Sequence, residues 1–265
     1  RYVDDISDSG HFSKPQAKQK LKGIIKDLIQ KRSKDPIVKN FIKLMKKKKI
    51  QSRTPIMLIN GVMQDLNIVK LKSLEELLIY SYKVAGTVGL MVCNILEVKK
   101  RNMKFKGIQL GIAMQITNII RDIDEDLKRN RMYFPLEYLT IKNQHTKQIL
   151  KSKKLQKNFS KDIEKLKLLS DKIYTNSRIG IYNLPIQYRI PIALASRLYQ
   201  SIGIKIMNYN YNVWGKRYYL SFFEKLLKSS FALFEIFLFR NTVNNKEIEN
   251  ELNKILFKLS NSYCE

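Results

Sequence analysis

The hydrophobic pattern of this chain repeats at the spacing of α-helices. In Ser73–Val98 and Lys106–Asn130 apolar residues recur every three or four positions and in places surround the helix completely. Ser73 is followed three residues later by Glu76, the spacing of an N-terminal capping box, which predicts a long and mostly buried helix. The strict alternation that is typical of strands is nearly absent. The pattern therefore predicts an all-α protein.

Helical spacing continues through the rest of the chain. Proline is favoured in the first turn of a helix, so we expect one helix to begin at Pro191. Tyr133–Pro135 marks the end of the second long helix, and the lysine-rich segment Lys34–Gln51 keeps apolar residues at helical spacing. The other predicted helices are Lys157–Asn183, Pro191–Asn210, Leu220–Phe239 and Asn245–Ser260. Because there are neither internal repeats nor a long linker, we predict one all-α domain over residues 1–265.

The composition is that of a folded protein: 44% of the residues are hydrophobic and 28% are charged. No uninterrupted apolar run approaches the roughly 20 residues that span a bilayer. Cys93 and Cys264 give neither a disulfide framework nor a metal knuckle, which suits a reducing cytoplasm. The chain begins with Arg1, inside a patterned segment, so we expect an N-terminal part to be missing; no signal peptide is visible.

The chain is strongly basic, with 50 Lys and Arg against 23 Asp and Glu and a formal net charge of +27. Three interpretations are open: a compositional bias with a solvated surface, attraction to anionic membranes or phosphorylated ligands, and nucleic-acid binding. We favour bias, because the lysines are spread along the whole chain. There is no zinc finger, RNA-binding aromatic motif or helix-turn-helix, so no nucleic-acid partner is expected.

Against this basic background, an acidic cluster is conspicuous. Four acids lie within five residues: Asp122, Asp124, Glu125 and Asp126. On a helix, Asp122 and Asp126 are one turn apart and share a face with Asn118 and Gln115. The surrounding residues are apolar, and burying an unpaired amide costs roughly 1 to 3 kcal/mol. This stripe therefore predicts a polar cavity.

A second acidic motif begins the chain, with Asp4 and Asp8 at the same spacing and Asp5 between them. Carboxylate oxygens are the ligands that Mg²⁺ takes, together with water and phosphate oxygens. The arginines that flank the two motifs are Arg1, Arg121, Arg129 and Arg131, and they would offer cations to a polyphosphate. The alternative for each motif is a solvated acidic helix end. The repeated spacing and the buried amides favour a site for metal and diphosphate.

The first long helix contains a stretch of small residues. Gly86 and Gly89 lie in mid-helix, where each costs roughly 1 kcal/mol relative to Ala, and Ala85 and Thr87 are their neighbours. Small side chains allow either another helix or a bound ligand to come close, and both alternatives stay open. Tyr82 lies one turn before Gly86 on the same face.

Four segments together resemble a known family. "DDISD", "YSYKVAGTVGLM", "LGIAMQITNIIRDIDEDLKRNRMYFPLEYL" and "ALASRLYQSIG" resemble, in order and spacing, the squalene and phytoene synthase family of head-to-head isoprenoid synthases. The resemblance runs from Arg1 to about Lys228 and is strongest to bacterial phytoene synthases. It implies an all-α isoprenoid synthase fold, in which helices surround a central apolar cavity and two aspartate-rich motifs face each other near its mouth. It also implies a family segment before Arg1 that carries further substrate contacts.

The resemblance implies roles for individual residues. Asp4, Asp8, Asp122 and Asp126 match the outer acids of the two motifs, which bind metal and take part in catalysis. Gln115 and Asn118 match the polar residues before the second motif, and Arg1 and Arg121 match the adjoining arginines. To these substrate-binding residues we add Arg131, which flanks the second motif. Tyr82, assigned to catalysis, and Tyr199 match tyrosines that line the cavity, and Arg217 in "GKRYY" matches an arginine that contacts phosphate.

The implied activity is that of a Mg²⁺-dependent phytoene synthase, with Mn²⁺ as the alternative ion. Such an enzyme condenses two geranylgeranyl diphosphates through a cyclopropyl diphosphate, releases diphosphate and needs no NADPH; this is the first committed step of carotenoid biosynthesis. One alternative is the same chemistry on farnesyl diphosphate, giving presqualene diphosphate, dehydrosqualene or squalene. The other is a non-catalytic assembly factor, against which the two complete acidic motifs argue. Because substrate and product are apolar and the surface is basic, we expect a cytoplasmic protein bound peripherally to the inner face of the membrane.

Overall fold

The computed structural model describes residues 1–8, 10–140, 146–238, 250, 252 and 254. Its α-helices are α1 (Tyr2–Asp8), α2 (Lys14–Gln30), α3 (Pro36–Lys47), α4 (Arg53–Gln64), α5 (Leu74–Ser81), α6 (Thr87–Ile95), α7 (Arg101–Lys128), α8 (Thr146–Lys151), α9 (Lys153–Tyr182), α10 (Ile186–Asn208) and α11 (Phe222–Leu238). A π-helical turn, η1 (Tyr82–Gly86), joins α5 to α6, and η2 (Leu136–Tyr138) is a 3₁₀ turn. The strands that the described residues form, β1 (Val69–Lys70) and β2 (Arg131–Met132), pair in parallel. The predicted all-α fold is confirmed.

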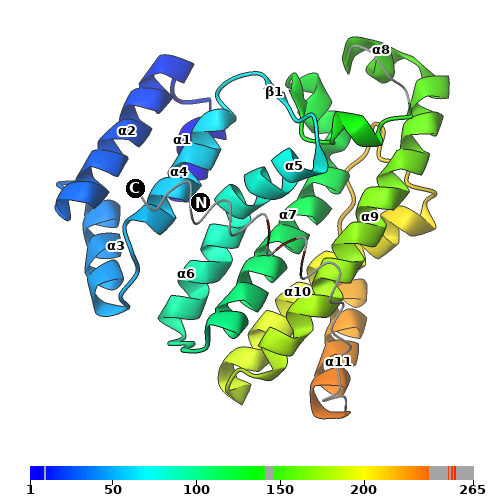
Figure 1. Ribbon diagram of the computed structural model, residues 1–265. Coiled ribbons are helices and arrows are strands. Elements are labelled where there is room, and N and C mark those ends of the chain that lie inside the picture. The colour runs from blue at the N-terminus through cyan, green and yellow to red at the C-terminus, as the bar shows by residue number, and fades with distance from the viewer. Residues whose placement is uncertain (9, 141–145, 239–249, 251, 253, 255–265) are drawn as a thin grey trace.

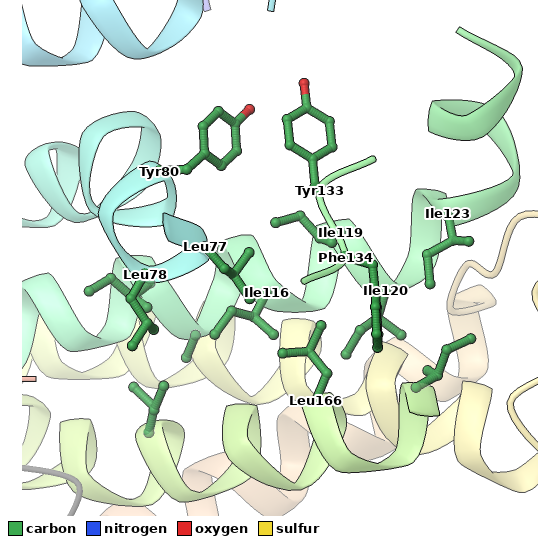
Figure 2. Close-up of a cluster of buried hydrophobic side chains, with 14 of the residues drawn as sticks. Leu77, Leu78, Tyr80, Ile116, Ile119, Ile120, Ile123, Tyr133, Phe134 and Leu166 are labelled. Carbon is green, nitrogen blue, oxygen red and sulfur yellow. The ribbon is translucent and has the colours of Figure 1, made fainter. Parts of the chain in front are cut away.

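The helix α7 lies in the middle of the bundle. Helices α1 to α4 form one side, α5 to α7 the centre, and α9 to α11 the other side (Figure 1). α7 packs on α9, α6 and α10, and a large apolar cluster forms around it. Figure 2 shows part of this cluster, with Ile116, Ile120, Phe134 and Leu166 gathered between the helices. A second apolar cluster lies among α1 to α4. The position of every other element near the cavity therefore depends on α7.

Glycines allow α6 and η1 to approach α7 closely. A Cβ on Gly89 would stand 2.8 Å from the carbonyl carbon of Gly107, and one on Gly111 would stand 3.1 Å from the Cα of Gly86. Both distances are too short for ordinary contacts with backbone atoms. Close helix packing, one of the two interpretations of the small-residue stretch, is therefore confirmed.

The beginning of the first long helix agrees with the sequence in part. The Ser73 hydroxyl accepts a hydrogen bond from the Glu76 amide at 3.2 Å, as expected for a cap. The Glu76 carboxylate, however, accepts from the amide of Lys72 at 2.6 Å rather than completing a capping box with Ser73. The π-turn in the middle of this helix was not predicted. Such turns occur often at functional sites because they shift the side chains that follow.

The prediction that a helix begins at Pro191 is wrong. α10 begins at Ile186, after Pro185, so Pro191 lies inside the helix. Proline cannot donate the backbone hydrogen bond to the carbonyl four residues earlier, which belongs to Gln187. Gln187 and Pro191 are both exposed, so water can satisfy that carbonyl and the helix continues.

The other predicted helices are confirmed where the structure describes them. α3 and α11 lie within the predicted segments. α9 begins at Lys153 rather than Lys157, and α7 begins at Arg101 rather than Lys106, so both begin earlier than predicted. The predicted helix 245–260 falls mainly outside the described residues, and the single-domain assignment of residues 1–265 stays a prediction.

The helix Leu74–Ile95, which includes η1, is long and apolar enough to cross a membrane by length and composition. It was not recognised as such from the sequence, because no uninterrupted apolar run was found. In the most apolar stretch of this helix, 39% is buried inside the protein. The helix packs against α4 and α7. A helix in the centre of a packed bundle can have the same length and apolar composition without crossing a membrane.

Alanine substitutions at two glycines should have opposite effects on stability. Gly89→Ala should lower the free energy of unfolding by about 1 to 3 kcal/mol, because the new Cβ collides with the backbone of α7. Gly23→Ala in α2 should raise it by up to about 1 kcal/mol, because nothing lies within 4 Å of the new Cβ and alanine favours the helix. Urea unfolding of both variants measures this. Equal effects would contradict the close approach of α6 and α7.

Candidate functional site

The second acidic motif lies near the C-terminal end of α7, where arginines neutralise one of its carboxylates. Arg121 donates from Nε and Nη2 to the two Asp122 oxygens at 2.8 and 2.6 Å. Arg217, from the segment after α10, reaches the same oxygens from Nε at 2.8 Å and Nη2 at 3.0 Å. Planar guanidinium groups suit such two-point contacts. The structure thus brings Arg121 and Arg217 to the motif, as the resemblance implied.

The other acids of this motif have different surroundings. Asp124 pairs with Lys128 at 2.5 Å and accepts the Gly215 amide at 3.2 Å. Glu125 pairs with Arg129 at 2.7 Å and lies 3.4 Å from Arg217. Asp126 makes no hydrogen bond or ion pair with any described residue; its burial, followed by the charge of Asp122, raises its pKa to about 7. Asp126 is therefore the acid of this motif whose negative charge is least compensated.

The first acidic motif is on α1. Buried Ile6 and the hydrogen bond from the Tyr2 hydroxyl to Asp35 hold this short helix in place. Asp8 accepts a hydrogen bond from Arg131 at 3.1 Å. The side chains of Arg1 and Asp4 are both largely exposed. The structure therefore connects Asp8 to the rest of the site, whereas the described contacts of Arg1 and Asp4 stay within α1.

Arg131 joins the two motifs. Its side chain is only 14% exposed and donates to Asp8. Its positive charge also acts on Asp126, where it opposes the rise in pKa. Among the described residues, no three His, Cys, Asp or Glu side chains are close enough together to hold a metal ion. The metal-ligand roles of Asp4, Asp8, Asp122 and Asp126 therefore stay predictions.

The side chains around Asp126 nevertheless suit a magnesium ion. Asp126 makes no ion pair with a described residue, and the buried Oδ1 of Asn118 has no hydrogen-bond partner. A divalent cation would satisfy such oxygens. Mg²⁺ needs only one or two carboxylates when water and diphosphate complete its shell, so a preformed cluster of three is not required. Asp126 and Asp122 would hold the ion, with Asp122 sharing its charge between the ion and the arginines.

A large cavity begins next to this acidic end. It has a volume of about 680 Å³ and lies between η1, α6, α7, the end of α9 and α10. Along α7 its wall runs from Met103 to Asn118, which at 1.5 Å per residue is about 22 Å. Gln115, Asn118 and, from α10, Tyr199 line it, as the sequence analysis implied. The expected polar cavity is in fact mainly apolar, with Gln115 and Asn118 at the acidic end and Lys99 and Lys100 at the other end.

The glycines of the helix contact also form part of the cavity wall. Gly89, Gly107 and Gly111 line the cavity as well as bringing the helices together. The ligand interpretation of the small residues therefore remains compatible with the packing. Tyr82 does not belong to the lining; its ring lies against Gly86, and burial raises the pKa of its hydroxyl.

Local patterns in the sequence do not indicate a half-buried acid that lies next to the site. Asp65, directly after α4, accepts hydrogen bonds from the hydroxyls of Tyr80 at 3.0 Å and Tyr133 at 2.7 Å. The two rings are stacked, with centroids 4.7 Å apart. Burial raises the pKa of Asp65 to about 6, although both tyrosines and Arg131 oppose the shift. No local pattern indicated this group, because its members are far apart in the sequence.

Comparisons with known proteins show the family and the fold of the chain. The sequence model of the family described as squalene/phytoene synthase matches residues 1–224. The 15-cis-phytoene synthase of Enterobacter agglomerans is 32% identical over 166 residues, 63% of this chain and 56% of that protein. The phytoene synthase of Thermus thermophilus is 34% identical over 167 residues, 63% of this chain and 57% of that protein. The chain thus spans just over half the length of these relatives. A dehydrosqualene synthase structure in complex with ligand has a TM-score of 0.76, covers 88% of this chain and 82% of its own, and is 22% identical, which shows the fold.

The raised pKa of Asp65 predicts a pH dependence of stability. Its folded-state pKa of about 6 lies above the usual pKa of an aspartate, 3.8, so the folded state holds this proton more tightly. The corresponding stability is present below about pH 4 and is lost as the pH rises through 6. Relative to Asp65→Asn, the unmodified protein should lose on the order of 3 kcal/mol between pH 4 and pH 7. Urea unfolding of both proteins across this range measures the difference. The prediction would be contradicted if the free energies of unfolding of the two proteins changed equally with pH.

Proposed function

The chain belongs to the squalene/phytoene synthase family, and from this premise we propose that it is a phytoene synthase acting on two molecules of geranylgeranyl diphosphate. The observation that carries the proposal is that the acidic and arginine-rich site lies directly at one end of the apolar cavity along α7. A substrate with a diphosphate head and a long hydrocarbon chain matches both parts. The relatives named phytoene synthase support this product over the shorter alternatives.

The proposed binding of the diphosphate uses the cationic end of the site. Arg121, Arg131 and Arg217 present guanidinium groups, which donate to pairs of phosphate oxygens. Asp122 and Asp126, with Asp4 and Asp8 from α1, would hold Mg²⁺, or Mn²⁺ as the alternative. When bound, the metal would supply positive charge that stabilises the departing diphosphate. Gln115 and Asn118 lie where the charged head would meet the hydrocarbon chain.

The carbon chemistry would take place in the cavity. Loss of diphosphate from one substrate leaves an allylic cation, which the double bond of the second substrate attacks; loss of a proton then closes a cyclopropyl diphosphate. Loss of the second diphosphate, rearrangement and loss of another proton give phytoene without a reductant. Water would quench these cations, so apolar walls such as Val88, Leu110 and Met114 contribute by excluding it and by aligning the two chains.

Conservative changes in the second motif test the proposed metal site. Asp122→Asn and Asp126→Asn should each lower phytoene formation by at least about 100-fold, because charge stabilisation of the leaving diphosphate is lost. Asp124→Asn is the matched control: its carboxylate turns toward Lys128 and Gly215, so its effect should be much smaller. Product is measured by extracting lipids after incubating the protein, expressed as its gene encodes it, with Mg²⁺ and geranylgeranyl diphosphate. Full activity in Asp122→Asn and Asp126→Asn would show that the metal assignment is wrong.

The same assay separates the alternatives. A parallel incubation with farnesyl diphosphate, with and without NADPH, shows whether the chain acts on the shorter substrate. If only a C₃₀ product formed, the chain would be a dehydrosqualene or squalene synthase and not a phytoene synthase. No product from either substrate would favour the non-catalytic assembly role.

We also propose that the cavity end farthest from the acidic site faces an anionic membrane. Lys99 and Lys100, between α6 and α7, line that end together with Asn183 and Pro185, between α9 and α10. Figure 1 shows both connections at the same end of the bundle. Lys99, Lys100 and Arg101 are exposed. A basic rim around an apolar opening suits a lipid surface from which prenyl chains enter and into which the product leaves. The proposal places the enzyme in the cytoplasm, on the inner face of the membrane.

Removing the basic rim should weaken binding to vesicles. Each lysine or arginine near an anionic surface contributes about 1 kcal/mol, so changing Lys99, Lys100 and Arg101 together to Gln should lower the affinity about 100-fold. A control that removes the same charge from exposed positions of α2, Lys18, Lys22 and Lys26, should bind nearly normally. Sedimentation with phosphatidylglycerol-containing vesicles at low salt measures both. Equal losses would mean that only net charge matters.

A further inference from the structure

The group formed by Asp65, Tyr80 and Tyr133 has no part in the proposed chemistry, yet it lies beside the acidic site. Both tyrosine hydroxyls donate to the one carboxylate, at 3.0 Å from Tyr80 and 2.7 Å from Tyr133. Figure 2 shows the two rings next to each other at the edge of the apolar cluster, with their hydroxyls pointing out of it. Placing a carboxylate in such a position is costly, because burial disfavours its charged form.

Tyr133 connects this group to Arg131, the arginine that joins the two acidic motifs. Tyr133 follows β2, which contains Arg131 and pairs with β1. The amide of Leu71 also donates to the carbonyl of Met132 at 3.0 Å. Asp65 comes shortly before β1 in the chain. The segment after α7 is therefore held through its backbone by β1 and through the Tyr133 hydroxyl by Asp65.

The charge of Asp65 acts on Arg131 directly. Arg131 lowers the pKa of Asp65, and Asp8 raises it, so the three groups lie within electrostatic range. Arg131 also acts on Asp126. The guanidinium thus has Asp8 on α1, Asp126 on α7 and Asp65 after α4 around it, and of these Asp8 is the one that accepts a hydrogen bond from it. Without Asp65, Arg131 would be drawn only toward the two motifs.

We propose that Asp65 is a positioning residue, which holds Arg131 between the two acidic motifs through its hydrogen bond with Tyr133 and through its charge. The inference rests on the proposed function, because it assigns Arg131 to the diphosphate of the substrate. Asp65 itself would not touch the substrate. Its effect on the reaction would pass entirely through the orientation of the Arg131 guanidinium.

This role and a simple charge effect predict opposite results. If Asp65 acted only as a nearby negative charge, its neutralisation would strengthen the binding of an anionic magnesium–diphosphate complex. If Asp65 positions Arg131, neutralisation must weaken binding, because the guanidinium loses its fixed orientation. The sign of the change therefore distinguishes the two.

A double-mutant cycle tests the coupling. Asp65→Asn, Arg131→Gln and the double variant are titrated calorimetrically with inorganic diphosphate in excess Mg²⁺ at pH 8. We expect each single change to weaken binding about tenfold and the double variant to bind no more weakly than Arg131→Gln. Additive losses, or tighter binding by Asp65→Asn, would overturn the inference. If the unmodified protein does not bind magnesium diphosphate at all, the proposed function fails and the inference fails with it.

Two tyrosine variants provide a matched comparison that does not depend on the folding of Asp65→Asn. Tyr133→Phe and Tyr80→Phe each remove one hydroxyl from the same carboxylate, but only Tyr133 belongs to the segment of Arg131. Diphosphate binding should weaken several-fold in Tyr133→Phe and change little in Tyr80→Phe. Equal effects would indicate a merely structural group and overturn the inference. Asp162→Asn, at a fully buried acid bonded to Thr140, should lower the unfolding temperature and leave diphosphate affinity unchanged.

Discussion

The structure depends on how the repulsion among carboxylates at one end of α7 is relieved. Asp122 and Asp126 lie one turn apart near the end of a largely buried helix, where water screens them poorly. Arginines from separate parts of the chain supply the opposite charge: Arg121 from α7 itself, Arg217 from the segment after α10, and Arg131 from β2. Since Arg131 also bonds Asp8, this compensation draws α1 toward the same place. Distant segments are thus brought together by one electrostatic requirement.

The same helix sets the relation between this charged end and the cavity. The face of α7 that carries Asp122 continues through Asn118 and Gln115 to Met103, so polar and apolar parts of the site lie on one rigid element. The glycines that bring α6 and η1 close to α7 also form part of the cavity wall. Packing and cavity shape are therefore not independent. A side chain added at Gly107 would disturb the contact with Cys93 and intrude on the cavity at the same time.

The sequence predicted the features that depend on local spacing, and it missed those that depend on distant neighbours. Helical periodicity identified α3, α7, α9 and α11, and the spacing of Asp122 and Asp126 placed both near Asn118. The π-turn at Tyr82–Gly86 arises from packing between helices, so nothing in its own residues predicts it. The preference of proline for the first turn of a helix is local and predicts a start at Pro191, whereas its tolerance inside α10 depends on the solvent around that turn. Asp65, Tyr80 and Tyr133 meet only in the folded chain.

The ion pairs of Asp122 determine how a metal and a diphosphate can enter the proposed site together. Asp122 already receives two hydrogen bonds from Arg121 and one from Arg217, whose Nε also lies 2.8 Å from it, so a cation alone must compete with both guanidinium groups for its oxygens. A diphosphate that arrives with the cation changes this balance, because it offers the guanidinium groups new phosphate oxygens in exchange for the carboxylate. Each positive charge then keeps a negative partner throughout. Binding of metal and diphosphate is therefore expected to be cooperative, since either ligand by itself leaves charges at this end of α7 unpaired.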